Sequence, residues 1–393
     1  MKISLSRMAC LAAALIAASA LLSLACTVKK KRAPGPLVVW LLADPDTDSF
    51  FRLLSDEFSK QADIEIELVF KETYEVRALL FNNPESIQGK VDLVEVDLYD
   101  LEQAAPAMEF LDPLFSQLER TESFPIGALA AGEFSGRKKF IPWRLSWPMM
   151  AVSSSLAPPD TWERLGQTAQ ANPGEVLIPA LDDREFFSFL CSVVWAFGGD
   201  PAKPYDDGLF QAFQWLAEIG PALSAKSSVT RSAEIFSIPA AERPGIFFEW
   251  PQGLLPFILD ASFQINLSAA GYPCGRGGNC PVLALGRYFG IPRNPPHLED
   301  AYQFILFIIG ANAQNQILFG TPWLPANSQG LTDLGARKAV YSAFAARLRD
   351  IKPPPRPVNK IERALTAAGR MLLFEQATPH DAITKYRKLM EQE

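Results

Sequence analysis

The sequence predicts an α/β protein, and three observations support that prediction. Between residues 37 and 70 an apolar run, a helical pattern and an alternating segment follow one another, which is the strand–helix–strand order of a parallel sheet. Strand and helix patterns continue to alternate over most of the remaining chain. The 393 residues are 48% hydrophobic with 27 Phe, enough for a full core in two domains or in one large one.

The first half of the chain body shows these patterns in order. Residues 37–42 are continuously apolar, as in a buried strand, and residues 64–70 alternate as in a half-buried one. Between them four apolar residues recur at helical spacing through Lys60. The patterns that follow predict a helix over 73–81, a strand over 91–96, a helix over 98–105, a hairpin or crossover over 132–144 and a strand over 148–152.

Capping residues mark the helices of the second half. Asp160 with Glu163 three residues later has the spacing of a capping box, and Asp182-Asp183 favours a helix start over a catalytic pair. The apolar patterns predict strands over 176–179, 245–250 and 287–292, and helices over 186–197, 209–218 and 298–310. From residue 331 to the end the pattern is helical, with a proline-rich break over 352–357.

The composition argues against a nucleic-acid partner and against metal or cofactor chemistry. The formal net charge is −7, and the only two histidines are His297 and His380. The sequence contains no Gly-x-Ser-x-Gly, His-Glu-x-x-His, Cys-x-x-Cys or phosphate-loop motif. We therefore expect binding without catalysis, with no catalytic residue, no metal and no cofactor.

The first 36 residues are predicted to export and anchor the protein. Lys2 and Arg7 precede an apolar run over 8–24 that is short for a membrane span and suits a signal peptide over 1–25. Ala25-Cys26 resembles the end of a bacterial lipobox, which implies diacylation of Cys26. A chance cysteine after an ordinary signal and an uncleaved anchor are the alternatives. Residues 26–36 are basic and then Pro/Gly-rich, as in a tether that lies on anionic headgroups or merely acts as a spacer. Each alternative places the body outside the cytoplasm.

Two of the remaining cysteines flank a flexible loop. Cys274 and Cys280 enclose three glycines, and in an oxidising compartment a disulfide between them is the favoured hypothesis. Cys191 lies in an apolar helical pattern, which indicates a buried small hydrophobe rather than a nucleophile.

Five stretches resemble one known family in content and in order. They are Val38-Val39-Trp40 before a helix ending in Phe58-Ser59-Lys60; residues 92–97 with Leu111-Asp112-Pro113-Leu114; Phe140-Ile141-Pro142-Trp143 with residues 159–165; Ala196-Phe197-Gly198-Gly199-Asp200; and residues 299–305 with Leu324-Pro325-Ala326. Together they resemble the family 1 extracellular solute-binding proteins, the maltose-binding-like receptors of ABC importers. The match spans roughly residues 37–330.

The resemblance implies a two-lobed periplasmic-binding-protein-like fold of type II. Lobe 1 would comprise residues 37–145 plus 282–330, and lobe 2 residues 146–281 plus 331–393 with the C-terminal helices. It also implies that a small-molecule solute binds between the lobes, and that hinge closure presents the loaded protein to an ABC permease in the cytoplasmic membrane. We expect the protein to act as a monomer.

Tryptophans near strand ends suggest a sugar or similar polyol as the solute, because aromatic rings stack on sugar faces while charged side chains bind the hydroxyls. Trp143-Arg144 and Glu249-Trp250 each combine a ring with a polar partner. The candidate ligand-binding residues are Asp44, Asp97, Trp143, Arg144, Trp147, Trp195, Glu249, Trp250 and Trp323. Core packing is the alternative role for each tryptophan, and helix capping is the alternative for Asp44 and Asp97.

Two other readings remain open at the level of sequence. An enzyme on the same bilobal fold, similar to thiaminase I, would need a cysteine nucleophile in the cleft, a role left to Cys191. A surface lipoprotein that keeps the fold without transport is the other.

Overall fold

The computed structural model describes residues 34–45, 47–118, 123–251, 253–254, 267–275, 277–331, 345 and 347–392. The predicted signal peptide, Cys26 and most of the tether lie outside these residues. Residues 37–393 form one compact unit, which is described below by itself. Among the described residues, no helix combines the length and the apolarity that a membrane span requires.

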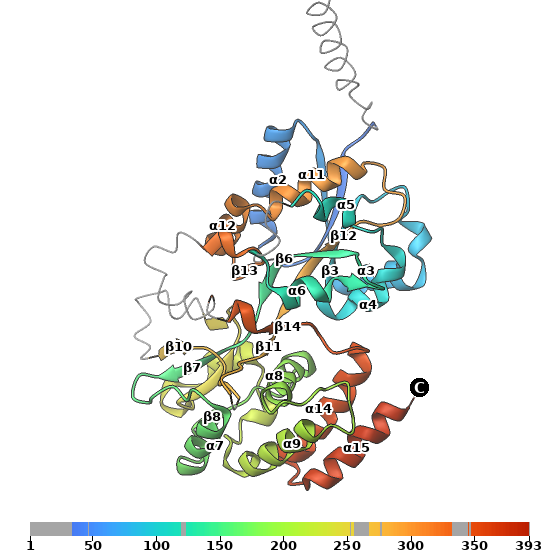
Figure 1. The fold of residues 1–393 in the computed structure, drawn as a ribbon. Helices are drawn as coiled ribbons and strands as arrows, with labels where there is room; N and C mark the ends of the chain where they lie inside the picture. Colours follow the sequence, from blue (N-terminus) through green and yellow to red (C-terminus); the bar gives the residue numbers. More distant parts are fainter. Residues whose placement is uncertain are drawn as a thin grey trace, which may run out of the picture. The chain divides into compact units, whose positions relative to one another are not determined.

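The larger sheet has six strands in the order β13-β6-β12-β3-β1-β2 (Figure 1). They are β1 (Leu37–Leu42), β2 (Ile66–Lys71), β3 (Leu93–Asp97), β6 (Phe140–Ser146), β12 (Leu285–Gly290) and β13 (Leu324–Pro325). Strand β1 pairs in parallel with β2 on one side and with β3 on the other. Strand β12 is antiparallel to both β3 and β6. The chain therefore leaves β1 for one neighbour and returns to the other, so the strand order reverses between β1 and β3.

The helices around this sheet bury apolar side chains against it or against one another. They are α2 (Asp48–Ala62), α3 (Thr73–Arg77), α4 (Leu101–Ala104), α5 (Asp112–Phe115), α6 (Ile126–Ala131), α11 (Leu298–Ile308) and α12 (Ala311–Gly320). The Phe58 ring of α2 meets the Phe304 ring of α11 edge-on, with centroids 5.2 Å apart. Such aromatic pairs stabilise beyond the area they bury.

The smaller sheet has four strands in the order β10-β7-β9-β8. They are β7 (Met149–Ser153), β8 (Val176–Leu177), β9 (Ile246–Glu249) and β10 (Leu267–Ala270). Trp162 lies at the centre of the aromatic core beside this sheet, with its ring 5.3 Å from that of Trp215 and 6.1 Å from that of Phe248. Only two residues separate β6 of the larger sheet from β7 of the smaller one, so the chain crosses directly between the sheets.

The helices near the smaller sheet include the C-terminal ones. They are α7 (Trp162–Ala171), α8 (Asp183–Ala196), α9 (Asp207–Ile219), α14 (Val358–Phe374) and α15 (Pro379–Glu391). Helix α14 packs against α8, α9 and α15 (Figure 1). Two small ladders complete the described strands: β11 (Val282–Leu283) with β14 (Ile351–Lys352), and the hairpin of β4 (Glu133–Phe134) with β5 (Arg137–Lys138).

The helix caps agree with the sequence at one position and differ at another. Asp182 caps α8 as predicted, because its Oδ1 accepts the backbone N–H groups of Arg184 and Glu185. The predicted start of α7 at Asp160 is wrong by one residue. Thr161 is the cap and accepts the N–H of Arg164, whereas the Asp160 carboxylate pairs with the Arg164 guanidinium at 3.0 Å.

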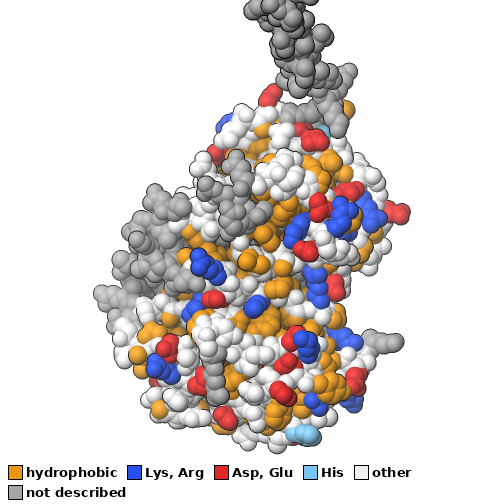
Figure 2. Space-filling model, in the orientation of Figure 1, with side chains coloured by type: hydrophobic (Ala, Val, Ile, Leu, Met, Phe, Trp, Pro, Cys, Tyr) orange, Lys and Arg blue, Asp and Glu red, His pale blue; other side chains and the backbone are white. Residues whose placement is uncertain are grey.

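Other differences concern short elements. The helix predicted over 73–81 is α3 followed by a π-helical turn over 78–82. The helix predicted over 98–105 is the short α4 with a 3-10 turn on each side. A disulfide joins Cys274 and Cys280, as the loop between them predicts. On the face shown in Figure 2, basic and acidic side chains are interspersed, with apolar side chains between them.

Candidate functional site

The candidate site lies at the carboxyl ends of β1 and β3, where the strand order of the larger sheet reverses. Asp44 follows β1 by two residues, and Asp97 is the last residue of β3. In open α/β sheets, ligands bind outside the carboxyl ends of the strands at this kind of reversal. The topology thus gives Asp44 and Asp97 a common location without any assumption about the ligand.

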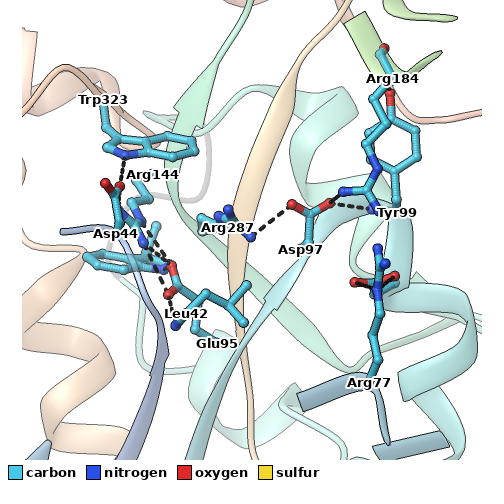
Figure 3. Close-up of polar contacts among 12 residues, drawn as sticks. Leu42, Asp44, Arg77, Glu95, Asp97, Tyr99, Arg144, Arg184, Arg287 and Trp323 are labelled. Carbon is cyan, nitrogen blue, oxygen red and sulfur yellow. Dashed lines mark hydrogen bonds and ion pairs between the residues drawn. The ribbon is translucent and has the colours of Figure 1, made fainter. Parts of the chain in front are cut away.

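Arg144 of β6 lies at the centre of this site and is fully buried (Figure 3). Its Nε donates to Glu95 Oε1 at 2.9 Å, its Nη2 to Glu95 Oε2 at 3.1 Å and its Nη1 to Asp44 Oδ2 at 3.2 Å. Burial lowers the pKa of Arg144, and the charges of Glu95 and Asp44 oppose that shift. Two-point contact with one carboxylate fixes the plane of the guanidinium.

A bulge in β6 explains how two consecutive residues reach the same carboxylate. The register between β6 and β12 shifts at Arg287/Tyr288, so that Pro142 and Arg144 are paired and Trp143 is skipped. Pro142 has no N–H for the ladder, and bulges of this kind redirect side chains. As a result, both the Trp143 indole N–H, at 3.1 Å, and Arg144 donate to Glu95 Oε1.

Aromatic rings enclose the Arg144 guanidinium. Its Cζ lies 4.7 Å from the ring centroid of Phe51 and 4.6 Å from that of Trp323. The Trp323 indole N–H also donates to Asp44 Oδ2 at 2.9 Å (Figure 3). Contacts of this type stabilise a buried cation, and here they hold Trp323 next to Asp44.

Glu95 was not among the residues predicted from the sequence. Its carboxylate is fully buried and also accepts the N–H of Leu42, the last residue of β1, at 2.7 Å. The signal that would have identified it is one acidic residue at an interior position of an otherwise apolar strand, where a charge needs a buried partner.

Asp97 connects the larger sheet to α8. Its Oδ2 accepts Arg287 Nη1 of β12 at 2.9 Å, and its Oδ1 lies 3.6 Å from Nη1 of Arg184, near the start of α8. The buried Tyr99 hydroxyl donates to the backbone carbonyl of Arg184 at 3.2 Å (Figure 3). The charge of Arg184 also acts on Glu362 of α14. Burial raises the pKa of Glu362 to about 6, and Arg184 opposes that rise.

A separate ion pair lies close by in the sequence. Arg77 Nε contacts both carboxylate oxygens of Asp100 at 2.9 Å. Burial raises the pKa of Asp100, and the hydrogen bond from Arg77 opposes that shift. Within the part of the chain that the structure describes, neither residue is hydrogen-bonded to Asp44 or Trp323.

Glu249 and Trp250 lie at the end of β9 in the smaller sheet. Glu249 is 1% exposed; its Oε1 accepts the Trp250 N–H at 2.8 Å, whereas its Oε2 has no partner among the described residues. Burial raises the pKa of Glu249 to about 8, and the Trp250 N–H lowers it. Glu249 is paired in register with Met149, the first residue after the crossing from β6. Among the described residues, no hydrogen bond or ion pair joins Glu249 or Trp250 to Asp44 or Arg144.

The other tryptophans predicted to bind a ligand take different places. Trp143 is 1% exposed, with its ring stacked on Phe289 at 4.8 Å, so core packing replaces the predicted solute contact. Arg144 requires the same correction, because full burial leaves it no surface for direct contact. Trp147 is buried in the crossing between the sheets. Trp195 lies at the end of α8, where its carbonyl accepts the Asn279 amide of the disulfide loop at 3.5 Å.

Cys191 is fully buried in α8, and burial raises its thiol pKa well above the usual value. A thiol in this state is packed rather than activated. The structure therefore lends no support to a thiaminase-like nucleophile at this position.

The model of the family described as bacterial extracellular solute-binding protein matches residues 54–333. The chain belongs to this family of solute-binding proteins. No curated protein sequence matches the chain. Maltose-bound MalE3 of T. maritima matches the fold with a TM-score of 0.71 and 17% identity, over 91% of this chain and 99% of that one.

Two further solved structures show the same fold. MalE of Xanthomonas citri, a sugar-binding protein, has a TM-score of 0.78 at 15% identity, over 91% of this chain and 97% of that one. UgpB of Mycobacterium tuberculosis, in complex with glycerophosphocholine, has a TM-score of 0.68 at 18% identity, over 91% of this chain and 98% of that one. The predicted two-lobed α/β fold of type II is thereby confirmed.

In this solute-binding protein, the strand-end site can accept hydrogen bonds beside an aromatic ring. The Asp44 side chain is 24% exposed and contacts Arg144 and Trp323 through Oδ2 alone, within the described part of the chain. Carboxylates accept several hydrogen bonds at once, which suits a solute rich in hydroxyl donors.

Proposed function

We propose that this chain is the substrate-binding lipoprotein of an ABC importer and captures a small polar solute, a sugar or similar polyol. One observation supports this most: a partly exposed carboxylate and a tryptophan, Asp44 and Trp323, are held together where the strand order reverses. Each of the two solved MalE relatives above is described as binding maltose or as a sugar-binding protein. Their sugar ligands are the basis for proposing a sugar here.

The proposed ligand contacts come from both lobes. Lobe 1, residues 37–145 plus 282–330, would contribute Asp44, Asp97 and Trp323. Lobe 2, residues 146–281 plus 331–393, would contribute Trp250 and Trp195. Glu249 and Trp147 are each 1% exposed, which is the burial that excludes Trp143 from direct contact. Micromolar affinity requires about −8 kcal/mol, which two rings and a few charged hydrogen bonds supply once closure has excluded water.

The experiment that tests the function is a search for the bound solute. Native mass spectrometry of the purified body should detect a retained molecule, and isothermal titration calorimetry with maltose, maltotriose, D-glucose, glycerol and glycerophosphocholine should identify a binder. Asp44→Asn should weaken that binding at least about tenfold, since each lost charged hydrogen bond is worth 1.5–3 kcal/mol. Arg164→Ala, which removes an exposed ion pair on α7, is the matched control.

A panel without any binder, together with an empty protein, would favour a surface lipoprotein that has kept the fold without transport. Binding that is unaffected by Asp44→Asn would place the solute elsewhere in the molecule.

We also propose that diacylation of Cys26 anchors the protein outside the cytoplasm of a bacterium, with residues 26–36 as its tether, as a monomer that docks on a membrane permease. Stable anchoring needs two acyl chains or one chain with a basic segment; diacylation would supply the first, and Lys29-Lys30-Lys31-Arg32 is a basic segment of the second kind. Palmitate labelling should disappear in Cys26→Ala. Labelling that persists in the variant would contradict the anchor.

A further inference from the structure

We propose that Arg144 is a positioning residue for solute binding: it sets the orientation of Asp44 and Trp323 without touching the solute. The inference rests on the proposed function only in assuming that a solute binds here, because the orientation of Asp44 and Trp323 exists in the free protein. Full burial of the Arg144 side chain rules out direct contact in this structure. Both residues that it holds are less buried than Arg144 itself, at 24% for the Asp44 side chain and 9% for Trp323.

The hydrogen bonds determine which oxygen of Asp44 remains available. Arg144 Nη1, at 3.2 Å, and Trp323 Nε1, at 2.9 Å, both donate to Oδ2. Oδ1 has no hydrogen-bond partner among the described residues, so it is the oxygen left to accept from a solute hydroxyl. A carboxylate held through one oxygen presents the other at a fixed angle, which is the preorganisation that binding sites require.

Glu95 fixes Arg144 in turn. It receives the Arg144 fork through both oxygens and also the N–H of Leu42, two residues before Asp44. The guanidinium therefore links the end of β1, the bulge of β6 and the start of β13, three segments far apart in the sequence. Only arginine suits this role, since a lysine ammonium can neither fork onto Glu95 nor stack flat between Phe51 and Trp323.

The variant that tests the proposal removes both charges of the buried pair. Arg144→Met alone would leave Glu95 buried without a countercharge and would destabilise the whole protein. Arg144→Met/Glu95→Gln leaves the net charge unchanged and keeps an acceptor for Leu42. Arg77→Met/Asp100→Asn is the matched control, since it removes another arginine–carboxylate pair, in which Arg77 Nε donates to both oxygens of Asp100 and not to Asp44.

The readout is the environment of Trp323 without any solute. Fluorescence of each protein minus that of its Trp323→Phe derivative isolates this indole, and acrylamide quenching reports its accessibility. We expect the quenching constant of Trp323 to rise at least about twofold in Arg144→Met/Glu95→Gln, because local order is lost, and to stay unchanged in the control. Melting temperatures are recorded for every protein, so that a change confined to Trp323 is separated from general destabilisation.

An unchanged Trp323 signal in the folded double variant would overturn the proposal. Should that variant fail to fold, Arg144→Lys retains the charge and provides the same test, with the same expected rise and the same contrary outcome. Because no solute is added, failure of the solute panel leaves this result standing, and failure here leaves the proposed function standing.

Discussion

At the scale of the residue, Trp143 shows why an aromatic near a strand end is not by itself a ligand platform. Strand β6 is buried along its whole length, so Trp143 lies in the core although its position near a strand end suggested an exposed ring. We expect Trp143→Ala to lower the free energy of unfolding by about 3–5 kcal/mol, the usual cost of removing a large buried aromatic. Urea denaturation measures this, with Trp40→Ala, a half-buried ring on β1, as the comparison. Equal losses in the two variants would contradict the assignment of Trp143 to the core.

Glu249 makes a pH-dependent contribution whose sign follows from its burial. Its pKa in the folded protein is raised to about 8, so its stabilising contribution is complete below the unfolded pKa and is lost as the pH rises through 8. We expect Glu249→Gln to remove this loss, so that the variant exceeds the wild type by on the order of a few kcal/mol at pH 9 and not at pH 5. Chemical denaturation at the two pH values tests this. A difference that is the same at both values would show that Glu249 does not titrate in this range.

At the scale of the element, the disulfide loop is held against the start of α7. The Cys274 N–H donates to the carbonyl of Asp160 at 2.7 Å, and the Trp162 N–H donates to the carbonyl of Cys274 at 3.2 Å. The bond spans six residues in sequence, so chain entropy predicts a loss of about 2 kcal/mol in Cys274→Ser/Cys280→Ser. Thermal unfolding with and without reductant measures it. Reductant should lower the melting temperature of the wild type only. An equal effect on the variant would show that the stability loss does not come from the disulfide.

The elements that the sequence predicted well are those with a strong local pattern. The apolar run of β1 and the helical spacing of α2 appear where expected, since burial of one face dictates both. Strands β10, β11, β13 and β14 were not predicted. Each has only two to four residues, too few for alternation to be visible.

The centre of the candidate site was harder to predict, for a geometric reason. Glu95 and Arg144 lie on strands that are not neighbours: β12 separates them, with Phe289 opposite Glu95 and Arg287 opposite Arg144. Their contact depends on the length of the arginine side chain and on the bulge at Trp143. Local sequence patterns contain neither fact, so Arg144 was expected to touch a ligand and Glu95 was not expected at all.

At the scale of the whole molecule, a few polar contacts join the end of β3 and the turns after it to helices that pack near the smaller sheet. Tyr99 and Asp97 reach Arg184 of α8, and the Val358 N–H at the start of α14 donates to Glu102 of α4 at 3.2 Å. If the two lobes open and close about the β6–β7 crossing, contacts of this kind must form in one state and break in the other. Their strength then helps to set how far the free protein favours the closed state.

Removal of the Tyr99 and Arg184 contacts should therefore favour opening. The Tyr99 hydroxyl bond is worth about 1 kcal/mol, and the partly exposed Asp97–Arg184 pair, at 3.6 Å, contributes at most about 1 kcal/mol. Tyr99→Phe/Arg184→Ala should thus shift the balance by up to about 30-fold toward an open form. Small-angle X-ray scattering would detect this as a larger radius of gyration without solute. Arg164→Ala removes an ion pair within α7 and its cap, and it should leave the scattering unchanged. Identical scattering from all three proteins would mean that closure is governed by contacts other than these.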